Sequence, residues 1–175
     1  MQMPNEIRIS TAFSEGLSNL LAELKLAIQW NRPSILLAVY KTESVRIKAE
    51  KALEQELNKN SQTFKRVKID NAQLDITQIF RLTNDPKQVV FSISGISNGG
   101  GEDGKDTYRT LNVYREILVE RSFRIIFWLT ETEAGNLPQF APDFWAFRHR
   151  VIEFARDRIH EENAVHHALR KAAPH

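Results

Sequence analysis

Hydrophobic residues recur along the chain in two alternating patterns, one typical of helices and one typical of buried strands. The helical spacing predicts helices over residues 12–31, 43–58, 72–82 and 107–121, shorter helical pieces over 131–137 and 141–147, and a last helix over 155–171. Apolar runs of strand length predict buried strands over residues 34–40, 88–94 and 123–129, and two short strands are expected over 64–69 and 150–154.

The order of these elements indicates a fold class. Strands separated by helices imply βαβ crossovers, which place parallel strands in one sheet and helices on both of its faces. We therefore expect a three-layer α/β fold around a mostly parallel, five-stranded sheet. The sequence has no internal repeat and no proline-rich linker, so residues 1–175 are expected to form one domain. Its core would span 34–154, between an N-terminal helix over 12–31 and a C-terminal helical tail over 155–175.

Composition excludes several classes of protein. No apolar run approaches the roughly 20 residues that span a bilayer, and the first residues lack the pattern of a signal peptide, so we expect a cytoplasmic protein. The absence of cysteine excludes disulfides, thiol catalysis and thiolate metal sites. A net charge of +2 does not by itself imply a nucleic-acid partner.

The segment over residues 111–154 contains the most distinctive motifs. It combines a Leu-Asn…Arg-Glu helix, a strand ending in Phe-Trp-Leu, an Ala-Pro-Asp-Phe-Trp-Ala-Phe stretch and a short Val-Ile-Glu-Phe strand. It resembles the second half of the NTPase-like domains that precede helical repeats in many bacterial STAND and AAA-type proteins, and residues 34–58 resemble the first half more weakly. The resemblance implies a P-loop NTPase-like core whose first strand is central, between the fourth and fifth strands. It also implies a setting in bacterial signalling or defence.

The first strand is not followed by a working phosphate loop. Such a loop needs glycines whose N–H groups surround phosphates, a lysine, and a Ser/Thr hydroxyl for Mg²⁺. Residues 40–44 read Tyr-Lys-Thr-Glu-Ser and contain no glycine, although Lys41 and Thr42 imitate the last pair of the motif. The next helix could still hold an anion at its N-terminus. The alternative is a tight strand–helix connection in which Thr42 or Ser44 caps the helix.

The acidic residue that would hold Mg²⁺ is absent as well. The strand over 88–94 presents Ser92 and Ser94 at its end, and no carboxylate follows before Glu102. Two independent losses predict that the chain does not hydrolyse a nucleotide.

A second phosphate-loop candidate lies between this strand and the next helix. Residues 99–105 match G-x-x-x-x-G-K through Gly99, Gly104 and Lys105, but Asp106 stands at the Ser/Thr position and Thr107 follows one place late. Two acidic residues inside the loop would repel phosphate. The alternative is a flexible surface loop in which Asp106 or Thr107 caps the helix.

A basic cluster, Arg148-His149-Arg150, precedes the last strand. By the resemblance, Arg148 has a sensor-like or structural role, and with Arg150 it could contact an anion. The alternative is that Arg148 pairs with a carboxylate such as Asp143 or Glu153.

The C-terminal histidines do not predict a metal site. His160 begins a motif like H-E-x-x-H, but Ala164 stands where the second ligand belongs.

These observations favour a non-catalytic pseudo-NTPase domain that needs no cofactor and acts by binding a protein partner. Two alternatives stay open. One is a nucleotide-binding switch or NTPase that uses ATP or GTP with Mg²⁺ through Lys41 or the 99–105 loop. The other is a nucleic-acid-binding accessory protein, based on the pI of about 8.9 and the basic residues Lys59, Lys65, Arg66 and Lys68.

Overall fold

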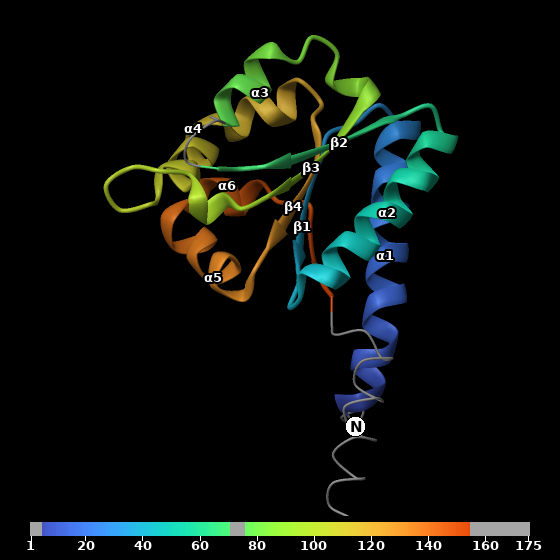
Figure 1. Ribbon diagram of the computed structural model, residues 1–175. Helices are drawn as coiled ribbons and strands as arrows, with labels where there is room; N and C mark the ends of the chain where they lie inside the picture. The colour runs from blue at the N-terminus through green and yellow to red at the C-terminus, as the bar shows by residue number, and fades with distance from the viewer. Residues whose placement is uncertain (1–4, 71–75, 155–175) are drawn as a thin grey trace, which may run out of the picture.

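The computed structural model describes residues 5–70 and 76–154, and these form a five-stranded parallel sheet with helices on both faces (Figure 1). The strands are β1 (Ser34–Val39), β2 (Thr63–Lys68), β3 (Val89–Ser94), β4 (Arg124–Leu129) and β5 (Arg150–Glu153). Their order is β2-β3-β4-β1-β5, and each neighbouring pair is parallel. The expected α/β fold is therefore confirmed. The first strand does lie between the fourth and fifth, but β4 is the middle strand of the sheet.

Helices cover the two faces unequally (Figure 1). The first face carries α1 (Asn5–Gln29) and α2 (Glu43–Lys59). The second face carries α3 (Ile76–Leu82), α4 (Asp106–Glu120), α5 (Glu131–Phe140) and α6 (Pro142–Phe147). Two short 3-10 turns, η1 (Pro86–Gln88) and η2 (Ile96–Asn98), lie before and after β3.

Most predicted boundaries agree with these elements to within three residues. The first helix is longer than predicted, because it begins at Asn5 rather than at residue 12. The third strand begins at Val89 rather than at the predicted residue 88, because residue 88 still belongs to the η1 turn, which starts at Pro86 and is capped by Asp85. Residues 72–75 of the third predicted helix, and the predicted tail over 155–175, lie outside the described residues.

Two hydrophobic cores form because side chains alternate across the buried strands. Along β1, Ile35 and Leu37 face α3–α6, whereas Leu36 and Ala38 face α1 and α2. All six residues of β4 are buried. This explains why the central strands have uninterrupted apolar sequences while β2, at the edge of the sheet, contains Lys65, Arg66 and Lys68.

The buried guanidinium group of Arg124 joins the amino end of the sheet to the neighbouring backbone segments. Arg124, at the start of β4, is 1 % exposed and donates to the carbonyl oxygens of Arg32 at 3.2 Å, Ala27 at 3.2 Å and Lys87. Burial lowers the pKa of the guanidinium. Because Ala27 belongs to the last turn of α1, the positive charge also lies at the negative end of that helix dipole. Arg124 therefore fixes α1 against the sheet.

None of the described helices is long and apolar enough to cross a membrane.

Candidate functional site

The carboxyl end of β1 is where a P-loop protein holds phosphate, at the N-terminus of the following helix. Here β1 ends at Val39 and α2 begins at Glu43, so the connection has only three residues. Thr42 occupies the N-cap position of α2 without capping it, and its hydroxyl lies 3.1 Å from the Ser44 hydroxyl. Neither predicted cap therefore acts as one.

A carboxylate occupies the first turn of α2. Glu43 accepts hydrogen bonds from the Tyr40 hydroxyl at 2.9 Å and from Arg46 Nε at 2.9 Å. Partial burial raises the pKa of Glu43, but hydrogen bonds from Arg46 and Tyr40 outweigh this and bring the net pKa below its usual value. Burial and the bond to Glu43 raise the pKa of Tyr40 to about 12. A fixed negative charge thus lies at the helix end that would attract a phosphate.

Lys41 extends toward the opposite face of the sheet. Its ammonium lies 3.9 Å from the carboxylate of Glu131, the first residue of α5, and both side chains are exposed. Exposed ion pairs of this kind contribute little to stability.

Charged residues in and next to the loop over residues 99–105 contact aromatic rings and one another. The Lys105 ammonium lies 4.8 Å from the Phe140 ring centre and 5.7 Å from the Tyr108 ring centre. Arg109 binds the carboxylates of Asp103 and Asp106. The ammonium of Lys105 is therefore directed at aromatic rings, and two carboxylates lie beside the glycines.

Local packing accounts for these glycines. A Cβ at Gly99 would lie 1.6 Å from Thr107 Oγ1, and Gly104 has a φ of 70°, which favours glycine. Helix α4 starts at Asp106 with Lys105 at its N-cap position, so the prediction that Asp106 or Thr107 caps it is wrong.

The two candidate lysines lie at opposite ends of α5. Lys41 contacts Glu131 at its start, and Lys105 contacts Phe140 at its end. A helix of ten residues is about 14 Å long. Figure 1 shows the 99–105 loop projecting from the α5 and α6 side of the sheet, away from α2. The structure therefore does not combine Lys41 and Thr42 with Gly99, Gly104 and Lys105 in one phosphate site.

The two arginines of the basic cluster lie at the other end of the sheet. The backbone N–H of His149 donates to the carbonyl of Ile35 at 2.9 Å, near the start of β1. Ile35 and Tyr40 are five residue steps apart along extended chain, which corresponds to about 16 Å. The Arg148 guanidinium lies 3.9 Å from the Trp145 ring centre, and Arg150 binds Glu23 of α1 at 3.3 Å. Arg148 pairs with neither of the carboxylates considered from the sequence, because its side chain stacks on Trp145 and donates to the Trp145 carbonyl.

The Leu-Asn…Arg-Glu and Ala-Pro-Asp-Phe-Trp motifs meet in the structure. Asn112 Oδ1, on α4, accepts from the backbone N–H groups of Asp143 at 2.9 Å and Phe144 at 3.1 Å. These are free N–H groups in the first turn of α6. The two motifs thus form a cap that joins α4 to α6.

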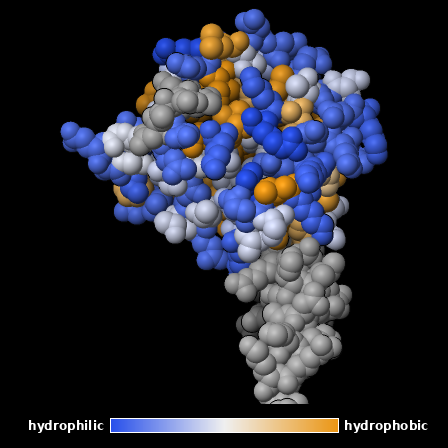
Figure 2. Space-filling view, in the orientation of Figure 1, coloured by the Kyte–Doolittle hydropathy of each residue, from blue (hydrophilic) through white to orange (hydrophobic). Residues whose placement is uncertain are grey.

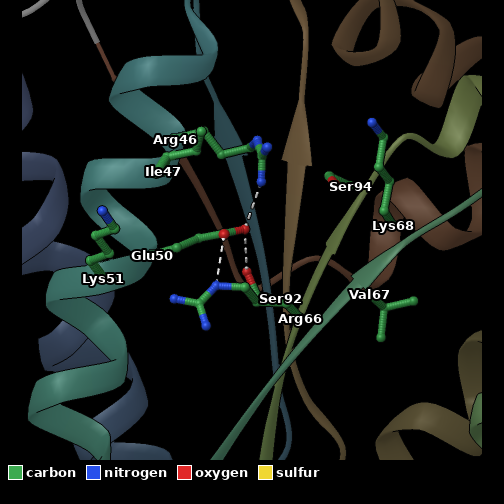
Figure 3. Close-up of a pocket in the computed structure, with 9 residues that line it drawn as sticks. All are labelled: Arg46, Ile47, Glu50, Lys51, Arg66, Val67, Lys68, Ser92 and Ser94. Atoms are coloured by element: carbon green, nitrogen blue, oxygen red, sulfur yellow. Dashed lines mark hydrogen bonds and ion pairs between the residues drawn. The ribbon is translucent and has the colours of Figure 1, made fainter.

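A buried polar cluster lies where β3 passes beneath α2, and the sequence analysis missed it (Figure 3). Ser92 Oγ donates to Glu50 at 3.0 Å and accepts from Trp128 Nε1 at 2.8 Å. Glu50, 4 % exposed, also accepts from Arg46 Nη1 at 2.9 Å and Arg66 Nε at 3.1 Å. Two guanidinium groups thus compensate a buried carboxylate.

One signal in the sequence could have revealed Glu50. It precedes Leu53 and Leu57 at helical spacing, so it lies in the apolar stripe of α2. A charge in such a stripe needs a partner inside the protein.

Comparisons with known proteins support the fold. No family model matches the sequence, and no curated protein matches it. Among solved structures, the chain is similar to the Aeropyrum pernix ORC2 protein in ADPNP-ADP complexes, with a TM-score of 0.50 and 11 % sequence identity. The match covers 81 % of this chain and 47 % of that chain, so this chain spans about half the length of its structural neighbour. At this identity the likeness shows fold alone: the chain has a P-loop NTPase-like α/β fold.

Proposed function

We propose that this chain is a non-catalytic P-loop NTPase-like domain that acts as a protein-binding or regulatory module. The observation that carries the proposal is the carboxylate of Glu43 in the first turn of α2, held there by Tyr40 and Arg46. This is the place where a catalytic relative would hold the phosphates of its nucleotide.

Two further observations support the absence of hydrolysis. The β1–α2 connection is too short to surround a phosphate and has no glycine. At the end of β3, Ser92 is engaged with Glu50 and Trp128, and neither Ser92 nor Ser94 can hold Mg²⁺ as a carboxylate would. As the resemblance suggests, we place the domain in bacterial signalling or defence.

The test is a hydrolysis assay with ATP and GTP in the presence of Mg²⁺. We expect phosphate release no faster than in the buffer blank, and no change in the Lys41→Ala or Lys105→Ala variant. Turnover that Lys41→Ala abolishes would overturn the proposal.

A melting experiment tests the alternative of a nucleotide-binding switch. A nucleotide at 100 times its Kd stabilises the folded state by roughly 2.7 kcal/mol. A Mg²⁺-dependent stabilisation that is lost in Lys41→Ala would favour a switch at α2, and one lost only in Lys105→Ala would place it at the 99–105 loop.

The partner is tested with the intact chain as bait in extracts of its own host. We expect the same partner to be retained with and without added nucleotide, and equally by the Lys41→Ala variant. A partner that is retained only when nucleotide is present would contradict a nucleotide-independent module.

A further inference from the structure

A groove with a volume of about 520 Å³ lies between α2 and strand β2, on the face of the sheet that α2 covers (Figure 3). This size falls in the range of small-molecule sites. Four cationic side chains line it, and the lining contains one carboxylate, Glu50. The cationic residues are Arg46, Lys51, Arg66 and Lys68.

Two of the cationic side chains belong to β2, whose register with β3 sets their position, and the other two belong to α2. Arg66 pairs with Ser92 and Lys68 with Ser94 in the β2–β3 ladder, so both basic side chains lie beside serines of β3. Lys51 extends from α2 on the opposite wall, and Figure 3 shows Lys51 and Lys68 on the two sides of the groove. Figure 2 shows a mostly hydrophilic surface over this side of the molecule.

The two arginines of the groove form ion pairs within the described part of the protein, whereas its two lysines do not. Arg46 binds Glu43 and Glu50, and Arg66 binds Glu50 and Glu54. These carboxylates hold both guanidinium groups in place along the groove. Neither lysine forms an ion pair with another residue in the described ranges, although Lys68 lies close enough to Glu43 to help lower the pKa of that carboxyl. The positive charge available to a ligand therefore lies mainly on the two walls.

A hydroxyl that has no partner among the described residues lies at the same place. Ser94 is 7 % exposed and lines the groove next to Lys68. Its hydroxyl makes no hydrogen bond to any residue in the described part of the chain and is open to the groove. A ligand oxygen in the groove would accept from it.

We infer that this groove binds an oligophosphate, such as pyrophosphate or the phosphate chain of a nucleotide, between Lys51, Lys68 and Ser94. Because the two lysines lie on opposite walls, an anion with charges on two linked groups suits the groove better than a single phosphate. The two ammonium groups offset part of its charge, and Ser94 donates to a phosphate oxygen. The site is separate from the Tyr40–Thr42 connection and does not depend on whether the proposed function is right.

The test is calorimetric titration with inorganic pyrophosphate, without Mg²⁺, at low ionic strength. We compare the wild type with Lys51→Gln/Lys68→Gln, and with the control Lys59→Gln/Lys65→Gln. The control removes the same charge from the same two elements, α2 and β2, but outside the groove. We expect affinity to fall at least tenfold in the first variant, to fall roughly tenfold in Ser94→Ala, and to stay within threefold in the control and in Lys41→Ala.

Three results would overturn the inference. They are the absence of pyrophosphate binding at millimolar concentration, an equal loss in both double variants, and retention of oligo-dT without any binding of pyrophosphate. ATP distinguishes the source of the phosphate chain. Equal affinities for ATP and pyrophosphate indicate that the phosphates alone are recognised, and tighter ATP binding indicates that the nucleoside adds contacts. Hydrolysis of ATP would refute the proposed function without affecting this result.

Discussion

The buried hydrogen-bond chain from Trp128 through Ser92 to Glu50 allows a quantitative prediction. In Ser92→Ala, the Trp128 N–H loses its only acceptor among the described residues, and Glu50 loses one of three donors. Both side chains are nearly inaccessible to water, with exposures of 0 % and 4 %. An unsatisfied buried polar group costs about 1–3 kcal/mol, so we expect Ser92→Ala to lower the free energy of unfolding by roughly 2 kcal/mol.

Urea denaturation at neutral pH, with Cm and the m-value fitted together, measures this change. For a domain of this size, the loss corresponds to a Tm lower by roughly 4–8 °C. The matched control is Ser97→Ala, because Ser97 is exposed and its hydroxyl bonds to no other described residue. The control should stay within about 0.5 kcal/mol of the wild type.

A double-mutant cycle identifies the cause of the loss. Trp128→Phe removes the indole N–H, so Ser92→Ala should cost about 1 kcal/mol less in that background than in the wild type. If the cost is the same in both backgrounds, the unsatisfied N–H is not its origin. A cost below 0.5 kcal/mol in the wild type would refute the argument as a whole.

Three further predictions concern other buried or capping contacts. Arg124→Met should lower the free energy of unfolding by about 3 kcal/mol, because three backbone carbonyls lose a charged donor. The control Arg109→Met, at an exposed arginine, should change the free energy of unfolding little. Equal effects of the two variants in urea denaturation would contradict this. Asn112→Ala should cost about 1 kcal/mol by uncapping α6, against a negligible effect of Val113→Ala, which is 71 % exposed. Partial burial lowers the pKa of His149, and its Nδ1 accepts a hydrogen bond from the backbone N–H of Ile35. Because the imidazole takes up a proton more readily in the unfolded chain, the free energy of unfolding should fall as the pH drops below about 6.5. His149→Gln should reduce that fall in a series of melts from pH 8 to pH 5, and an unchanged pH profile would exclude His149 as its source.

The fold was predictable because its signals are local and repeated. Apolar runs such as the one over 34–39 belong to strands that helices cover on both faces, so no polar position interrupts them. The prediction that β1 lies between β4 and β5 followed from the resemblance to NTPase-like domains and not from the hydrophobic pattern. The pattern alone does not say which strands pair, since parallel pairing depends on long crossovers.

The candidate site was less predictable, because its contacts join distant parts of the chain. Ser92 was noted only as a missing carboxylate, yet it bridges Glu50 and Trp128, which lie 42 and 36 residues away. The match of residues 99–105 to a phosphate loop rests on residue types alone. A motif records residue types, whereas Gly99 is required by its contact with Thr107.

The position of β2 at the edge of the sheet affects how this protein behaves in concentrated solution. An edge strand offers unpaired backbone groups to any other extended chain, and the charges of Lys65 and Lys68 would repel a second copy that approaches in this way. A bound polyanion would neutralise part of this repulsion. The charge that attracts a ligand to the α2–β2 groove would therefore also disfavour pairing of two copies through this edge, and saturating the groove should lower the solubility of the protein.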